Sequence, residues 1–373
     1  ASGAIVEDKL FFYGLYNPRN ISQLDCTTTR CNDITRSDPF YGVKIDFVPF
    51  DGHRLEYTFF SDNQSADYVV SKVDNEGDRV GALVGDSAFR NGGANHIYRY
   101  TGTFTDWFTL SAMYGENTYD RSYNSGSDTP SILEFRDDAP GDQTGFDPSI
   151  ANLTEGADTR KAYRIDADFY FNLAGEHHVR VGWDQEKLRS IEDQRYNGNA
   201  ALRYYTRAAS STGERVRFRQ YWNQGDFSTT QSAAYIQDSW QITNNLTINL
   251  GLRNETFDNR NADGDTFVKI SNQLAPRFGF SWDPTGDGSN RVYGSWGRYY
   301  LPIATNTNIR MAGRELYVQQ FFELPTGWNP DIPYITGPHI TPAQLTDHRL
   351  NGTPLPWVTA GMLACAMFTA LLV

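Results

Sequence analysis

The residues best suited to catalysis are two adjacent histidines and two closely spaced carboxylates. His177 and His178 lie at a predicted tight turn, and Asp166 and Asp168 are separated by one residue on a predicted strand. Acid–base catalysis needs a positioned proton donor and acceptor, and nucleophilic catalysis needs a nucleophile beside a base. No Ser/His/Asp or Cys/His arrangement has supporting sequence around these residues. We therefore predict that the chain is not an enzyme and has no catalytic residues.

Cysteine and acidic side chains offer two further possibilities, a disulfide and a cation site. Cys26 and Cys31 are spaced C-x4-C in a loop rich in Thr, Asn and Asp, whereas Cys365 stands alone near the end. A zinc site would need further Cys or His ligands nearby, so a local disulfide in an oxidising compartment is preferred over two free thiols. The acidic turns 261–265 and 283–290 lack the bidentate Glu of a dedicated calcium loop. We predict no metal ion and no cofactor.

The segments that carry these residues alternate apolar and polar side chains with a period of two, which is typical of strands with one apolar face. The 23 Phe, 22 Tyr, 8 Trp and 32 Gly fit many strands and turns, and residues 1–350 contain no apolar run of helical length. The alternation defines an apolar set of Val43, Ile45, Ile165, Phe169, Leu246, Ile248, Leu250, Phe278 and Phe280. It also defines a polar set of Lys44, Asp46, Arg164, Asp166, Asp168, Arg180, Asp184, Arg253 and Arg277.

The connections between strands alternate between short and long. Tight turns are predicted near 50–53, 104–106, 174–177, 243–245 and 283–290. Between successive turns lie a strand, a long polar loop and a strand, provided that 201–222 forms a hairpin within one such loop. Short turns on one side and long loops on the other are typical of outer-membrane barrels, whereas a soluble sandwich has no reason to sort its loops.

The predicted fold class is therefore all-β, an antiparallel transmembrane β-barrel of outer-membrane type. The strands are about 9–14 residues long, enough to cross a bilayer at a tilt, and lipid requires every backbone group to be paired. We count about 11 or 12 spanning strands, which is part of a larger barrel. The apolar set is expected to face lipid, and the polar set is expected to face the lumen.

The charge distribution excludes one class of partner and suggests another. The net charge is −12 and no cluster of Lys and Arg appears, so nucleic acid is not an expected partner. Loops near 62–95, 120–158, 186–227 and 255–272 are long and polar and are expected to form the outer recognition surface. Loop 120–158 is strongly acidic, which favours solubility or association with lipopolysaccharide through divalent cations.

Four segments together resemble the barrel of Oar-like TonB-dependent outer-membrane receptors: "GAIVEDKLFFYGLYN", "YIQDSWQITNNLTINLGLRNETFDN", "QLAPRFGFSWDPTGDG" and "VYGSWGRYYLPIATNTNIRMAGRE". The resemblance covers roughly residues 1–350. It implies a bacterial outer-membrane receptor for an unknown ligand, with lipid and lipopolysaccharide around a barrel of about 22 strands. It also implies a plug domain that receives energy from TonB.

The chain departs from this family because it contains no plug, no TonB box and no later strands. We therefore expect that it does not transport anything by itself. A passive porin-like or structural barrel stays an alternative, as does a soluble carbohydrate-binding β-domain.

The segment 351–373 breaks the alternating pattern of residues 1–350. From Pro356 onward about 18 residues carry no charge, which is long enough for a spanning helix. Flanking Lys or Arg anchors are absent, and an exported barrel protein must cross the inner membrane without being stopped there. We expect residues 356–373 to come from a frameshift or a truncated gene prediction, with a genuine anchor as the alternative.

Overall fold

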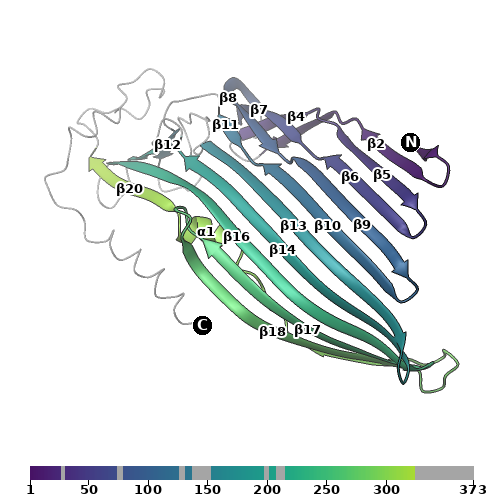
Figure 1. Cartoon of the computed structure of the whole chain (residues 1–373). Coiled ribbons are helices and arrows are strands. Elements are labelled where there is room, and N and C mark those ends of the chain that lie inside the picture. The colour runs from purple at the N-terminus through teal and green to yellow at the C-terminus, as the bar shows by residue number, and fades with distance from the viewer. Residues whose placement is uncertain are drawn as a thin grey trace.

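The computed structural model of this 373-residue chain describes residues 1–26, 30–73, 79–125, 131–136, 153–196, 201–206 and 215–323. These residues form one large, curved and almost entirely antiparallel sheet with a single short helix (Figure 1). The predicted all-β class, a partial outer-membrane barrel, is confirmed. The predicted tail, 351–373, lies outside the described residues.

The main part of the sheet is a series of strands that pair in chain order, which we call the wall strands. They are β1 (Ser2–Val6), β2 (Leu10–Asn17), β5 (Phe40–Phe50), β6 (His53–Ser61), β9 (Ala94–Thr105), β10 (Phe108–Asp120), β13 (Leu153–Asn172), β14 (Glu176–Arg195), β16 (Arg215–Thr243), β17 (Leu246–Arg260), β18 (Thr266–Trp282) and β19 (Val292–Gly297). Within the described part of the chain, β1 and β19 are the open edges, so the barrel is not closed.

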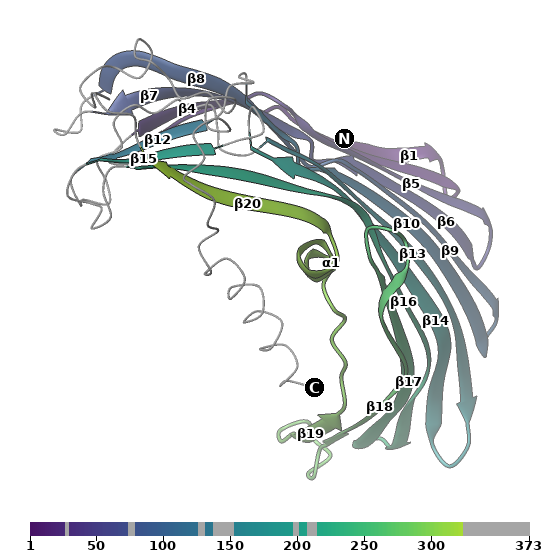
Figure 2. The ribbon, with the colours of Figure 1, turned by 90° about the vertical axis from the view of Figure 1, so that its left-hand side faces the viewer.

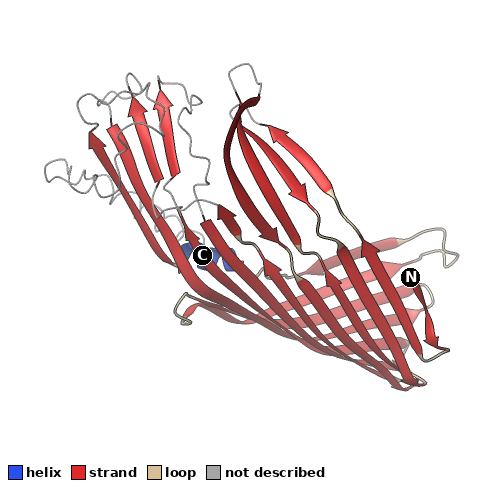
Figure 3. Ribbon diagram, turned by 90° about the horizontal axis from the view of Figure 1, so that it is seen from above, coloured by secondary structure: helices blue, strands red, loops and turns tan. Residues whose placement is uncertain are grey.

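Short turns join the wall strands at one end of the sheet, as the sequence predicts. These turns are residues 7–9, 51–52, 106–107, 173–175, 244–245 and 283–291. Gly52 and Gly175 lie in two of them with φ of 78° and 127°, a backbone region that side chains with a Cβ rarely adopt. The other connections between wall strands, which apart from 261–265 are longer than these turns, lie at the opposite end, where the sheet continues beyond the wall (Figure 3).

Strands lie within the long connections between wall strands, which corrects the prediction of outer loops near 62–95, 120–158 and 186–227, and one further strand, β20, follows β19. These outer strands are β3 (Ile21–Cys26), β4 (Arg30–Arg36), β7 (Gln64–Val73), β8 (Arg79–Asn91), β11 (Tyr123–Ser125), β12 (Ser131–Arg136), β15 (Ala201–Thr206) and β20 (Arg314–Glu323). The predicted hairpin at 201–222 is present, since β15 pairs with the start of β16. The wall strands also run further than predicted, and β17 and β18 occupy most of the expected loop 255–272.

Polar contacts explain why strand pairing continues past the apolar segments. Arg121 lies 2.9 Å from Asp158 of β13 and 2.6 Å from Glu192 of β14, which ties the outer ends of these two 20-residue strands together. Backbone pairing in water needs no apolar face, so the end of the alternation does not end the strand. Hydrophobic periodicity therefore underestimates strand length at this end.

The chain leaves the sheet edge after β19, which is shorter than the predicted strand 291–301. Residues 298–304 turn onto the concave side of the sheet and lead into α1 (Thr305–Met311), which lies inside the curve (Figure 2). The chain then returns to the sheet as β20, which pairs with the outer half of β16. Within the described residues, no helix has the length and apolar character that a membrane-spanning helix requires.

Candidate functional site

Strand alternation and cross-strand register place the polar set on one face of the sheet. On β13, Arg164 and Asp168 lie directly opposite Asp184 and Arg180 of β14. Because side chains alternate between faces and opposed residues share a face, the charged residues of both strands lie together. The position of α1 identifies this face as the concave one (Figure 2). Residues of α1 form hydrogen bonds with Thr229 of β16. Tyr235, six residues further along β16, points to the same face as Thr229, and its hydroxyl bonds Asp166 of the polar set.

A first ion cluster lies near the short turns. Asp168 is 4% exposed, and its Oδ1 accepts hydrogen bonds from Arg180 Nε at 2.7 Å and from His178 Nε2 at 2.6 Å. A buried carboxylate is costly unless it is paired and hydrogen-bonded, and these two donors satisfy it. His178 therefore acts as a hydrogen-bond partner of Asp168.

A second and larger cluster lies one step further along the same strands. Asp166, 6% exposed, accepts hydrogen bonds from Arg164 Nε at 2.8 Å and from the Tyr235 hydroxyl. Arg253 binds both oxygens of Asp184, at 2.7 and 2.9 Å. The guanidinium carbons of Arg164 and Arg253 lie 5.8 and 5.3 Å from the Tyr235 ring centroid. The tyrosine thus links two arginine–carboxylate pairs through its ring and its hydroxyl.

Gly182 makes room for this cluster. It lies opposite Tyr235 on β16, and a Cβ at this position would overlap both the tyrosine ring and Asp166 Oδ1. A side chain at position 182 would therefore separate the two groups. Strand alternation alone does not reveal this requirement, because glycine fits either face.

A third cluster, on β5 and β6, includes two residues that the sequence prediction missed. Lys44 Nζ lies 3.2 Å from Asp46 and 2.9 Å from Glu56, and Arg54 lies 2.9 Å from Asp46 and 3.2 Å from Glu56. Arg54 and Glu56 alternate with Leu55 and Tyr57 in sequence, so the same periodicity could have identified them. Each cation is shared between two carboxylates, which neutralises this part of the concave face.

The remaining member of the polar set, Arg277, joins no cluster. It occupies the concave face of β18, and its guanidinium carbon lies 4.6 Å from the ring centroid of Tyr299. Tyr299 belongs to the segment that leaves the sheet edge after β19. The contact therefore holds that segment against the concave face.

Buried amides fix α1 to the concave face, a feature that the sequence analysis did not find. Asn308 and Asn259 are fully buried, and Asn259 Nδ2 donates to Asn308 Oδ1 at 2.9 Å and to Ile303 O at 3.1 Å. Asn308 Nδ2 in turn donates to Arg260 O at 3.2 Å, and Asn223 Nδ2 donates to Ile309 O at 3.2 Å. The signal available in sequence, Asn and Thr repeated in 305–308, does not specify a partner.

The apolar set occupies the convex face. Leu250 lies opposite Phe278, and Ile248 lies opposite Phe280, across β17 and β18. Exposure remains large on this face, with Ile165 50%, Leu250 45% and Phe278 42% exposed. The alternation along each strand places the other members of the apolar set on this face as well: Val43, Ile45, Phe169 and Leu246. An extended exposed apolar surface of this kind marks contact with a partner or a membrane.

An acidic residue, Asp238, lies within the apolar part of the convex face. Asp238 of β16 lies between Val179 and Leu250 in the cross-strand row. His177 Nδ1 lies 2.7 Å from its Oδ2, and the His177 ring is stacked on Phe171 and Trp240 with centroids 5.0 and 5.1 Å away. His177 and His178, adjacent in sequence, therefore serve carboxylates on opposite faces of the sheet.

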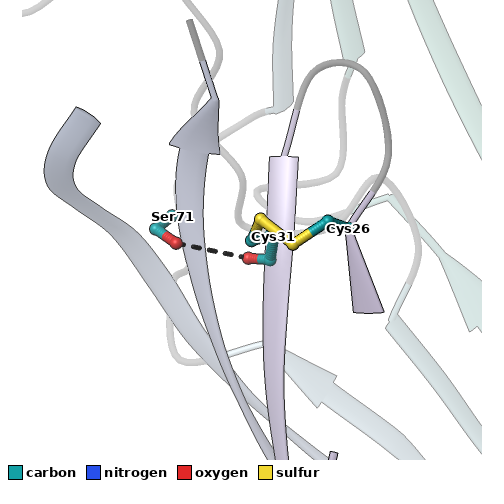
Figure 4. Close-up of a disulfide and its surroundings, with 3 residues drawn as sticks. All are labelled: Cys26, Cys31 and Ser71. Atoms are coloured by element: carbon teal, nitrogen blue, oxygen red, sulfur yellow. Dashed lines mark hydrogen bonds between the residues drawn. A yellow bond between two sulfur atoms is a disulfide. The ribbon is translucent and has the colours of Figure 1, made fainter. Parts of the chain in front are cut away.

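The disulfide and the acidic turn 261–265 lie at the outer end of the sheet, and the acidic turn 283–291 lies at the opposite end. Cys26 and Cys31 are bonded across the β3–β4 hairpin, and the Ser71 hydroxyl donates to Cys31 O at 3.5 Å (Figure 4). In the turn 283–291, Asp287 accepts hydrogen bonds from Ser289 and Thr285, which lower the pKa of its carboxyl to about 2. Among the described residues, no group of three or more His, Cys, Asp or Glu side chains is placed to hold a metal ion.

Comparisons with known proteins agree with this geometry. The family model for the TonB dependent receptor-like β-barrel matches residues 37–340. The TonB-dependent transporter Oar of Myxococcus xanthus is 27% identical over 155 residues, which are 38% of this chain and 15% of that protein.

Two solved structures from Pseudomonas aeruginosa, FpvA and the ferripyoverdine receptor of the outer membrane, share the fold. FpvA bound to a heterologous pyoverdine has a TM-score of 0.53 and 14% identity, covering 79% of this chain and 39% of that one. The receptor bound to ferripyoverdine has a TM-score of 0.50 and 15% identity, covering 82% and 40%. The chain thus spans about two fifths of these receptors and less of the curated relative.

Proposed function

The chain belongs to the TonB-dependent receptor-like β-barrel family of outer-membrane proteins, and from this premise we propose that it forms part of the wall of a ligand transporter. Its convex face contacts lipid, including lipopolysaccharide, and its concave face lines the lumen. A plug domain outside this chain fills the lumen and receives energy from TonB. The wall segment does not transport by itself, and the ligand is of unspecified chemistry.

The observation that carries this proposal is the sorting of charge between the two faces. Asp166 and Asp168 are almost fully buried against concave arginines, whereas Ile165 beside Asp166 is half exposed on the convex side. In a barrel, the lumen accommodates hydrated and paired charges, and the outer surface must be apolar. In water, the same convex face would expose an unusually large apolar surface.

The charged clusters also suggest how a plug is held. Arg253, Asp184 and Glu255 border a recess of about 220 Å³ on the concave side, near Arg164. A plug surface with charged groups complementary to these can form hydrogen bonds with them. When the plug moves away, no charge on the wall is left unpaired, because Arg253, Asp184 and Glu255 already bond one another. Family members act as receptors and transporters, and the ion clusters here serve the wall and not a reaction.

Site-directed labelling tests the orientation. Single cysteines at Leu250 and Phe278, in the intact protein with Cys365 replaced by Ser, are expected to react with a lipid-restricted maleimide in native outer membranes. Cysteines at Thr247 and Asn249 are expected to react only with a water-soluble reagent. Labelling of Thr247 and Asn249 by the lipid probe, without labelling of Leu250, would reverse the assignment and would also contradict the proposed lumen.

Permeability separates the transporter from the passive porin-like or structural barrel. The intact protein reconstituted in liposomes is expected to give no swelling in neutral sugars, because the plug closes the lumen. Deletion of the plug is expected to allow swelling. Rapid swelling with the intact protein would favour the porin-like alternative.

A further inference from the structure

A groove on the convex face is lined by tyrosines from four neighbouring wall strands. Tyr57, Tyr98, Tyr114 and Tyr163 are direct partners in one cross-strand row through β6, β9, β10 and β13. Successive ring centroids lie 4.9, 6.1 and 5.1 Å apart. We call this the tyrosine row.

The next row toward the short turns supplies the apolar floor of the groove. Leu55, Tyr100, Ala112, Ile165 and Trp183 follow one another across the strands in this row. Because Ala112 is much smaller than its neighbours Tyr100 and Ile165, a groove of about 500 Å³ opens above it. Its walls are apolar and partly exposed, which suits contact with an alkyl chain.

The tyrosine hydroxyls indicate where the apolar surface ends. The Tyr57 hydroxyl is 3.0 Å from His96 Nδ1, and the Tyr114 hydroxyl donates to Glu116 at 2.5 Å. His96 and Glu116 belong to the row immediately beyond the tyrosines, toward the outer strands. Tyrosine rings with their hydroxyls turned toward polar groups are characteristic of a membrane–water interface.

Two lysines lie side by side at this boundary. Lys161 of β13 and Lys187 of β14 are direct cross-strand partners in the polar row beyond the tyrosines. Lys161 forms an ion pair with Glu116 at 3.5 Å, and Lys187 Nζ lies 6.0 Å from the Tyr163 ring centroid. In the described part of the chain, no carboxylate lies within ion-pairing distance of Lys187. Directly opposed residues have Cβ atoms about 4.5–5.5 Å apart, so one anionic group can reach both ammonium groups.

We propose that this surface is a binding site for the phosphorylated, acylated glycolipid of the outer leaflet. A phosphate lies between Lys161 and Lys187, and an acyl chain lies in the groove over Ala112. This inference rests on the proposed function, because the convex face must contact lipid. The lysines lie on the side of the tyrosines away from the short turns, which is the outer side of such barrels. The outer leaflet supplies a lipid that combines phosphate with several acyl chains.

The test uses the intact protein in detergent, with binding of bis-phosphorylated hexa-acyl lipid A measured by native mass spectrometry. The Lys161→Ala/Lys187→Ala double variant is expected to bind lipid A about tenfold or more weakly, because two charge-assisted contacts are lost. Ala112→Trp is expected to weaken binding by filling the groove, without any change of charge. Lys269→Ala is the matched control, since Lys269 continues the same cross-strand row on the convex face but lies far from the groove.

Probe chemistry distinguishes the lipid sources. Lipid A without its phosphates is expected to bind the unmodified protein about as weakly as lipid A binds the double variant. Equal competition by phosphatidylglycerol would assign the site to a glycerophospholipid and would overturn the proposal. Unchanged lipid A binding in both Lys161→Ala/Lys187→Ala and Ala112→Trp would also overturn it. If the lipid probe still labels the Leu250→Cys variant in that case, the proposed transporter wall survives the failure of this site.

Discussion

Replacing Ala167 by Arg tests whether the convex face contacts the hydrocarbon of a membrane. Ala167 is the middle one of five convex positions on β13 that run from Tyr163 to Phe171, and its cross-strand partners are Leu110 and Val181. Eight residue steps span about 26 Å along the strand, or about 20 Å along the membrane normal at a tilt of about 40°. Ala167 therefore lies about 10 Å from either end of the apolar band.

At that depth an Arg is expected to lower the free energy of unfolding by about 2–4 kcal/mol. The described neighbours of Ala167 on the convex face offer no carboxylate, so the charge remains unpaired. Leu250 is a poorer position for this test, because Asp238 lies directly opposite and can pair with an introduced Arg. The structure thus predicts a smaller cost at Leu250 than at Ala167.

The assay is reversible urea unfolding of the intact protein into phospholipid vesicles, followed by tryptophan fluorescence. Asn249→Arg is the matched control, because Asn249 is exposed on the concave face beside Ser239 and Gly279. We expect it to change the free energy of unfolding by no more than about 0.5 kcal/mol. A neutral Ala167→Arg together with a strongly destabilising Asn249→Arg would refute the assignment of the two faces.

Two further predictions concern the concave cluster and the last short turn. Gly182→Val is expected to lower the free energy of unfolding by about 1–3 kcal/mol, because the valine side chain displaces Tyr235. The same urea assay should give a much smaller loss when Gly182→Val is made in a Tyr235→Ala background. Equal losses in the two backgrounds would contradict the coupling between the two residues. The pKa of Asp287, about 2 in the folded turn, lies below the unfolded value of about 3.9. The stabilisation of the fold by ionised Asp287 is therefore complete above about pH 4 and is lost as the pH falls through about 2. The difference in unfolding free energy between the unmodified protein and Asp287→Asn should vanish below about pH 2. A difference that stays constant from pH 7 to pH 2 would contradict this assignment.

The sequence predicted the wall strands well because the environment on each face is so different. In segments such as 40–50, which coincides with β5, every second residue must suit one face, and period two is therefore easy to detect. The partners within the clusters were partly accessible for the same reason, since Asp168 and Arg180 lie at corresponding distances from the 173–175 turn.

The remaining features depend on contacts that no local pattern encodes. Most outer strands, such as β7 (QSADYVVSKV), mix apolar and polar residues without a long clean alternation, so periodicity gives a weak signal there. The segments 62–95 and 120–158 were therefore predicted as loops. Asn308 is fully buried only because Asn259 and Thr229, distant in sequence, supply its hydrogen-bond partners. Asp238 is a charged residue on the apolar face, which the alternation of apolar and polar residues does not predict. Its hydrogen bond with His177 accounts for this position, but the pairing follows only from the register of β14 and β16.

The pairing of β20 with β16 has a consequence for how the chain folds. One edge of β16 pairs with β17 over Ser228–Thr243 and with β20 over Arg215–Gln224, so the strand has two successive partners on that edge. The β17 partner follows immediately after a two-residue turn, whereas Arg219 and Gln319 are 100 residues apart. Closing so long a loop costs more conformational entropy than closing a hairpin, and contacts of high sequence separation form slowly. The hairpins of the wall therefore assemble first, and the segment that carries α1 is enclosed by the last pairing to form.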